Sequence, residues 1–202
     1  MPLAIATAPT VEPLAVVDAK RYWGVDFGED DDRIEMCLKA GRIWVEHFLG
    51  RAIVNRTYAL YLRTWPTERF LRLPYPPLAS VTSITYTGSD GVAFGSTLAS
   101  SDYTAETWRE PGRVVLDFDA AWPTLYGDGE KDEVKVTYVA GSGATAAAVL
   151  TAQKHNIVEA ISVVGRAYYE KPDLFMSGQE YRNESAEALL WSDRFLGEVD
   201  GL

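Results

Sequence analysis

Cysteine and histidine are scarce in this sequence of 202 residues, which has one cysteine, Cys37, and two histidines, His47 and His155. A single cysteine excludes an internal disulfide, and a zinc site built from so few thiols and imidazoles would need carboxylates as further ligands. We therefore expect no disulfide framework, no bound metal and a reducing compartment.

Long apolar runs are also missing. No stretch approaches the roughly 18 residues that a membrane-spanning helix requires, and the first ten residues, MPLAIATAPT, contain neither lysine nor arginine. We expect no membrane partner and no signal peptide, and we interpret residues 1–13 as a flexible N-terminal arm.

The chain has fewer basic residues than acidic residues. The 29 acidic residues outnumber the 19 basic residues, which gives a formal net charge of −10 at pH 7. The acidic excess is spread along the chain, without the basic stripe that strong binding to nucleic acid requires. Such acidity favours solubility, and it also suits a surface along which DNA must slide without adhering.

No group of residues makes a convincing catalytic or cofactor site. The pattern Gly141-x-Gly143-x-x-Ala146 follows a predicted strand and opens a helix, as a dinucleotide-binding fingerprint does, but no later strand completes that unit. The histidines have no nucleophile at a spacing that identifies a partner. Asp117 and Asp119 are more typical of a solvated strand face than of a carboxylate pair. We expect no catalytic residue and no cofactor.

Two helices are predicted near the N-terminus, one over about residues 16–23 and a longer one from Asp30 to Gly50. The longer helix has one apolar stripe that suits packing on the core. A second stripe lies nearly opposite and contains Met36, Ala40 and Ile43. Two stripes indicate either a central helix in a monomer or a helix that also contacts a neighbouring subunit.

The hydrophobic period changes to two between residues 52 and 140, in segments rich in tyrosine, valine, threonine and isoleucine. Turn residues separate these segments, among them Pro76-Pro77, Ser-Asp-Gly and Glu-Pro-Gly. Proline donates no backbone hydrogen bond, so the Pro-Pro pair marks a corner where the chain leaves one sheet edge for another strand. This region predicts an antiparallel sheet or a small sandwich.

A helical period returns at residues 144–171 and ends at Lys171-Pro172. The remaining residues, 172–202, form a tail with one dense apolar group: Leu189, Leu190, Trp191, Phe195 and Leu196. A short helix exposing these side chains is marginal in water. They either dock on a partner protein, the interpretation that we favour, or cap the helices of the same chain.

The predicted fold class is α+β. Residues 14–51 and 144–171 are expected to form one α-helical bundle, residues 52–143 an inserted antiparallel β domain, and residues 172–202 a docking segment.

The corner and the segments after it resemble the head-tail connector, or adaptor, proteins of long-tailed bacteriophages (siphophages) and of gene transfer agents. The resemblance covers about residues 14–171. The motifs that carry it, in chain order, are Leu73-Pro74, Pro76-Pro77-Leu78, Ser80-Val81, Tyr86 to Gly91, Ser101-Asp102-Tyr103, Pro111-Gly112-Arg113, Trp122-Pro123 and Tyr138 to Gly143.

The resemblance implies a structural virion protein without catalytic residues. Proteins of this family form rings, commonly of twelve copies, that bind beneath the portal protein at the capsid vertex. They present a surface to a stopper or another tail-side neck protein, and genomic DNA passes through the channel without specific binding. The implied location is the virion neck, after assembly in the host cytoplasm. Two alternatives remain. One is a β-sandwich decoration or recognition module of the capsid or tail, and the other, which the sequence favours less, is a hydrolase.

Overall fold

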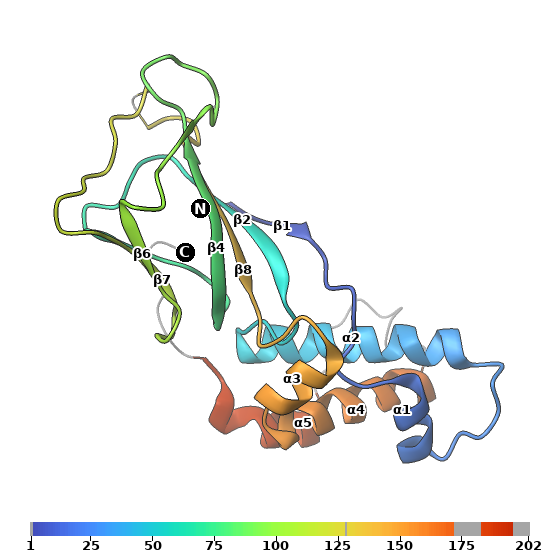
Figure 1. Ribbon diagram of the computed structural model, residues 1–202. Helices are drawn as coiled ribbons and strands as arrows, with labels where there is room; N and C mark the ends of the chain where they lie inside the picture. The colour runs from blue at the N-terminus through green and yellow to red at the C-terminus, as the bar shows by residue number, and fades with distance from the viewer. Residues whose placement is uncertain (1, 128, 172–182, 196–202) are drawn as a thin grey trace. The chain divides into compact units, whose positions relative to one another are not determined.

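The computed structural model describes residues 2–127, 129–171 and 183–195, which divide into two compact units. The helical unit contains residues 9–54 and 142–195, and the β unit contains residues 2–8 and 55–141. Figure 1 labels their elements: β1 (Leu3–Thr7), α1 (Val16–Trp23), α2 (Asp31–Leu49), β2 (Arg56–Leu62), β3 (Phe70–Arg72), β4 (Leu78–Tyr86), β5 (Ser96–Thr97), β6 (Tyr103–Glu106), β7 (Arg113–Leu116), β8 (Val134–Ala140), α3 (Ala146–Ala152), α4 (His155–Glu170), α5 (Glu184–Leu190) and the 3-10 helix η2 (Trp191–Asp193). Helices and antiparallel sheets together confirm the α+β class. Among the described residues, no helix is long and apolar enough to cross a membrane.

The helical unit is organised around the packing of α2 against α4. Helix α2 begins where Asp31 and Asp32 meet the positive end of the helix dipole, and it ends at Gly50, whose φ of 65° is left-handed. Its inner stripe joins residues of α4 and α5 in one core: Val45, Leu49, Ile157, Ala160, Ile161, Val164, Ala186 and Leu190 are all buried there.

Helices α2 and α4 approach closely at Gly41 and Gly165. A Cβ atom placed on Gly41 would lie 2.7 Å from the carbonyl oxygen of Ile161 and 3.0 Å from the backbone nitrogen of Gly165. Both neighbours are backbone atoms of a packed helix, so neither can move aside by rotating a side chain. The crossing therefore requires glycine at position 41.

Gly41→Ala is expected to lower the free energy of unfolding by about 1–3 kcal/mol, because the added methyl group overpacks this crossing. The matched control is Gly28→Ala, where a Cβ meets nothing within 4 Å, and its effect should stay within about 0.5 kcal/mol. Urea unfolding followed by circular dichroism measures both. Equal stabilities for the two variants would contradict the close crossing.

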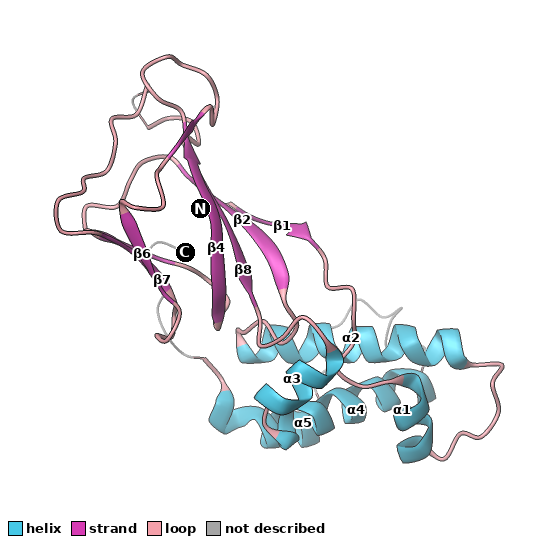
Figure 2. Ribbon diagram, viewed as in Figure 1, coloured by secondary structure: helices cyan, strands magenta, loops and turns pink. Residues whose placement is uncertain are grey.

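The β unit contains two antiparallel sheets (Figure 2). One has five strands in the order β1-β2-β8-β4-β5, and the other has three in the order β3-β7-β6. Strand β8 lies between β2 and β4, with Tyr138 opposite both Tyr58 and Val81. The alternation of β8 buries every second side chain, so these inward residues form the centre of the unit's core.

The N-terminal residues differ from our expectation. We predicted a flexible arm over residues 1–13, but Leu3–Thr7 form strand β1, paired antiparallel with β2, with Ala4 opposite Ala59. Backbone hydrogen bonding to β2, rather than burial of side chains, holds this strand, since four of its five residues are exposed.

The proline corner connects the two sheets of the β unit. Strand β3 belongs to the three-stranded sheet and β4 to the five-stranded sheet, and residues 73–77 lie between them. Tyr75 takes a left-handed φ of 58°, and the Pro76–Pro77 peptide is cis. The hydroxyl of buried Tyr138 donates to the carbonyl oxygen of Pro74 at 3.0 Å, and the Tyr75 ring stacks on Tyr58. The corner is thus fixed by side chains of the larger sheet.

Candidate interaction surfaces

The outer stripe of α2 is exposed on the helical unit. The side chain of Met36 is 69% exposed and that of Ile43 is 42% exposed, while Ala40 between them is half-buried. On the opposite side of the same helix, Ile34 and Leu38 are buried. The three residues predicted for a subunit contact therefore share one accessible apolar strip, and the contact itself stays a prediction.

A buried ion cluster lies on the inner side of α2. Arg42 is 1% exposed, and its Nε and Nη2 atoms donate to the two carboxylate oxygens of Glu12 at 2.7 and 3.0 Å. Its Nη1 atom donates to Glu46 Oε2 at 2.7 Å, and Glu46 Oε1 accepts the backbone N–H of Ile53 at 2.9 Å. Arg42 therefore ties residue 12, before α1, to residue 53, after α2.

Electrostatics keep this cluster charged. Burial works to lower the pKa of the Arg42 guanidinium, but the hydrogen bonds and negative charges of Glu12 and Glu46 outweigh burial and hold that pKa above its ordinary value. A bidentate arginine–carboxylate pair of this kind fixes geometry as well as charge. The cluster is a structural clamp within the helical unit rather than a reactive site.

The C-terminal apolar group divides between the core and the surface. Leu190 is fully buried in the core of the helical unit, and Leu189 packs against that core. The prediction that Leu190 is a docking residue is therefore wrong, because its side chain is already covered by this chain's own helices. Trp191 is 68% exposed, Phe195 is half-buried, and Leu196 lies outside the described residues.

Polar contacts attach the segment after α5 to the rest of the helical unit. Asn156 donates from Nδ2 to the carbonyl oxygen of Leu189 at 2.7 Å and to Asp193 Oδ2 at 2.8 Å. Lys154 pairs with the same Asp193 carboxylate, and hydrogen bonds from Lys154 and Asn156 hold the pKa of Asp193 below its ordinary value. Further along, the backbone N–H of Phe195 donates to the carbonyl oxygen of Leu49 at 2.8 Å. This anchoring leaves Trp191 as an exposed aromatic on a fixed backbone.

A groove of about 540 Å³ lies on the helical unit between α1, the end of α3 and α4. Trp23 forms part of its wall, and the indole Nε1 donates to Ser162 Oγ at 3.0 Å, which joins α1 to α4. Tyr22 and Leu150 line the groove and are exposed. We did not predict this groove, because its lining comes from three helices far apart in the sequence.

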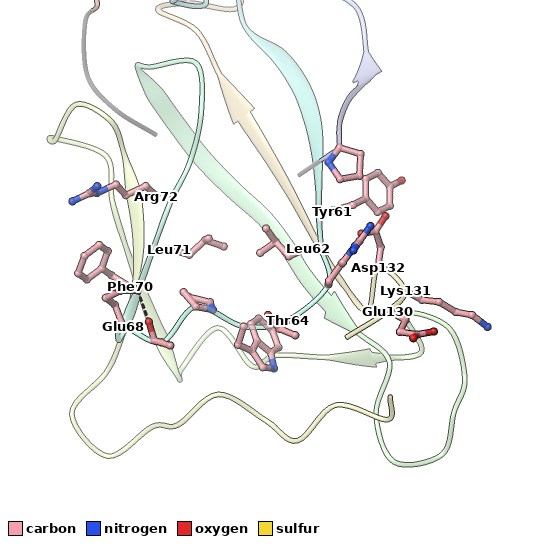
Figure 3. A pocket seen from close by; sticks show the side chains of 15 residues that line it. Tyr61, Leu62, Thr64, Glu68, Phe70, Leu71, Arg72, Glu130, Lys131 and Asp132 are labelled. Atoms are coloured by element: carbon pink, nitrogen blue, oxygen red, sulfur yellow. Dashed lines mark hydrogen bonds between the residues drawn. The ribbon is translucent and has the colours of Figure 1, made fainter. Parts of the chain in front are cut away.

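A second groove, of about 770 Å³, lies on the β unit. Figure 3 shows Leu62 and Leu71 between two groups of polar and aromatic side chains. One group comes from β3 and the residues before it, and the other from β2 and residues 130–132; the labelled members are Glu68, Phe70, Arg72, Tyr61, Glu130, Lys131 and Asp132. Its lining includes neither histidine nor cysteine, and its charges are of both signs.

Two exposed aromatic side chains lie next to strands of the three-stranded sheet. Trp108 lies in the turn between β6 and β7, and Phe118 follows β7. The turn is braced by Glu106, whose Oε2 atom lies 2.6 Å from Arg113 Nε and 3.0 Å from Arg109 Nε. Trp108 was not predicted as a contact residue, although the Glu-Pro-Gly turn that follows it in the sequence is a signal of a surface position.

The residues weighed for catalysis are not assembled into a site. His47 and His155 are exposed on α2 and α4, and Asp117 accepts a hydrogen bond from the Thr104 hydroxyl at 2.8 Å. Within the described part of the chain, no three histidine, cysteine, aspartate or glutamate residues are grouped so as to hold a metal ion. A Cβ on Gly143 would lie 2.8 Å from the backbone nitrogen of Val149, so close packing explains this glycine without a bound nucleotide.

The comparisons with known proteins identify the fold. No protein-family model matches the chain, and no curated protein matches it. Solved structures do match along the full length. A chain from "Neck of empty GTA particle computed with C6 symmetry" has a TM-score of 0.76 at 20% identity. A chain from "Virion of native gene transfer agent (GTA) particle" has a TM-score of 0.75 at 22% identity. A chain from "Neck of native GTA particle computed with C12 symmetry" has a TM-score of 0.74 at 21% identity.

Each match covers 100% of this chain and 99% of the other. The chain therefore has the fold of neck and virion components of gene transfer agent particles.

Proposed function

We propose that this protein is a head-tail connector, or adaptor, of a phage-like particle. It forms a ring of twelve copies that binds beneath the portal protein at the capsid vertex and carries a stopper or other tail-side neck protein. The observation that carries the proposal is the full-length likeness to neck chains of gene transfer agent particles, over both units and nearly all of each chain. The location that follows is the virion neck, after assembly in the host cytoplasm.

The charge of the chain supports a position around the DNA channel. A net charge of −10 without a basic stripe leaves little attraction for a passing polyanion. Genomic DNA would move through the ring without specific binding. We also propose that the protein has no enzymatic role, since its apolar strips and exposed aromatics suit protein contacts.

The exposed aromatic after α5 supports a contact with the portal or an adjacent subunit. Trp191 is accessible on an anchored backbone, and large aromatic side chains are frequent interface hot spots. We retain Trp191, Phe195 and Leu196 as the docking residues and Leu189 as a flanking contact. Leu190 belongs to the folded core instead.

The proposal is tested by locating the protein in the assembled particle. A tagged copy of the full chain should replace the untagged protein in a particle-producing host, and symmetry-averaged electron cryomicroscopy should show the tag in a ring between the portal and the tail. A tag distributed over the capsid surface would favour a decoration protein and contradict the proposal. A matched strain with Trp191→Ala should yield more tailless heads than a strain with the exposed control Trp108→Ala.

A further inference from the structure

The outer strip of α2 forms an apolar ridge, defined here as Met36, Ala40 and Ile43. These residues recur at spacings of four and three, so their side chains lie along one line of the helix. The ridge is bordered by Lys39, which is exposed and makes no ion pair among the described residues. It is an apolar surface with the positive charge of Lys39 beside it, and exposed Asp32 lies one turn nearer the start of the helix.

The groove between α1, α3 and α4 is the concave counterpart on the same unit. Its apolar lining includes Tyr22, Leu150 and Val158, and its volume of about 540 Å³ is sufficient for several large side chains. Glu159 also lines it, is exposed, and likewise has no ion-pair partner within the described ranges. Asp18 and Arg166 also line the groove, but they pair with Arg21 at 3.4 Å and with Glu170 at 2.7 Å. The groove is therefore a hollow with apolar lining in which Glu159 is the carboxylate available to an outside partner.

We propose that the α2 ridge of one copy of this chain docks in the α1–α3–α4 groove of the next copy, with Lys39 facing Glu159. The inference rests on the proposed ring and identifies the two surfaces that join its subunits. Ridge and groove share no residue, so the contact is head-to-tail. A head-to-tail contact repeats from copy to copy and closes into a ring when its rotation permits.

Complementarity favours a second copy over another protein as the occupant. The ridge is apolar with Lys39 beside it, the groove is hollowed and partly apolar with Glu159 in its lining, and the folded chain carries both. A contact of this kind gives every subunit of a ring one donor and one acceptor face. It also explains why the second stripe of α2 remains uncovered within a single chain.

The test uses a mixture of two variants of the full-length protein. The ridge variant is Met36→Asp with Ile43→Asp, and the groove variant is Tyr22→Asp with Leu150→Asp. All four side chains are exposed, so both variants should keep the wild-type circular dichroism spectrum and thermal midpoint. The control is Val17→Asp, an exposed apolar position on α1 that does not line the groove.

Sedimentation velocity over a concentration series should show self-association of the wild type and of the control. Each variant alone should associate at least about thirtyfold more weakly, as expected when a hot spot is lost. Because each variant keeps one intact face, their mixture should form a species of two chains. A monomeric wild type, undiminished association of either variant, or a mixture that stays monomeric would overturn the inference.

Charge reversal tests the orientation. Lys39→Glu alone and Glu159→Lys alone should each weaken association several-fold at low salt, and the double variant should recover it. If the double variant does not recover association, Lys39 and Glu159 do not face each other across the contact.

The outcome is separable from that of the proposed function, which is judged by location in the particle. Normal neck incorporation of the ridge variant would overturn the pairing and leave the connector role standing. If ridge and groove associate in solution but the protein is not found in the neck, the pairing stands and the connector role is overturned.

Discussion

Arg42→Ala is expected to lower the free energy of unfolding by about 3–5 kcal/mol, the cost typical of breaking a buried ion pair from one side. Arg42 is 1% exposed, and its removal takes away three charge-assisted hydrogen bonds, two to Glu12 and one to buried Glu46. Glu46 is itself buried and also holds the backbone N–H of Ile53, so it cannot move to water without releasing that hydrogen bond. Urea unfolding followed by circular dichroism measures the change.

The matched control is Arg21→Ala. Arg21 makes an exposed i,i+3 pair with Asp18 at 3.4 Å, and exposed pairs contribute at most about 1 kcal/mol. A third variant, Arg42→Lys, keeps the charge but not the planar fork that reaches Glu12 and Glu46 together. It should fall between the wild type and Arg42→Ala. A cost for Arg42→Ala no larger than that for Arg21→Ala would contradict the clamp.

Leu190→Ala is expected to lower the free energy of unfolding of the isolated protein by about 2–5 kcal/mol. The leucine is fully buried among side chains of α2, α4 and α5, and truncation there loses transfer energy and leaves a cavity. Thermal and urea unfolding of the purified protein provide the measurement.

The neighbouring aromatic is the control for Leu190. Trp191→Ala removes a larger side chain, but one that is mostly exposed, so the isolated protein should change by no more than about 0.5 kcal/mol. In the particle, where Trp191 is proposed to dock, Trp191→Ala should impair the joining of heads to tails more than Leu190→Ala does. If Leu190→Ala proved as mild as Trp191→Ala in isolation, the packing of α5 on the helical unit would be contradicted.

The sequence predicted many of the secondary-structure elements because each repeats its own period locally. Helices expected over residues 16–23 and 30–50 match α1 and α2, where aspartates at the start and glycines at the end supply unmistakable boundaries. The alternating segments became strands such as β2, β4 and β8. Strand β1 was missed because its residues are mostly exposed and acquire their conformation by pairing with β2, about 55 residues away in sequence.

The candidate surfaces were predicted in part, for the same reason. The strip of Met36, Ala40 and Ile43 follows from helical spacing on one element, and the structure leaves Met36 and Ile43 exposed and Ala40 half-buried. The groove of α1, α3 and α4 follows from no local pattern, since Tyr22 and Leu150 meet around it only after folding. The ion cluster of Arg42 was also missed, because i,i+4 charges on a helix usually lie at the surface.

The sequence by itself determined the period of each segment, its boundaries, the shortage of metal and disulfide ligands and the acidic charge, since all of these are properties of residues close together or counted singly. Only the tertiary structure decided which apolar side chains are used internally and which remain for partners. Leu190 and Trp191 are adjacent and both strongly apolar, yet one is enclosed by α2 and α4 and the other faces outward. That difference depends on the direction in which α5 packs, a direction set by long-range contacts such as those of Asn156 with Leu189 and Asp193.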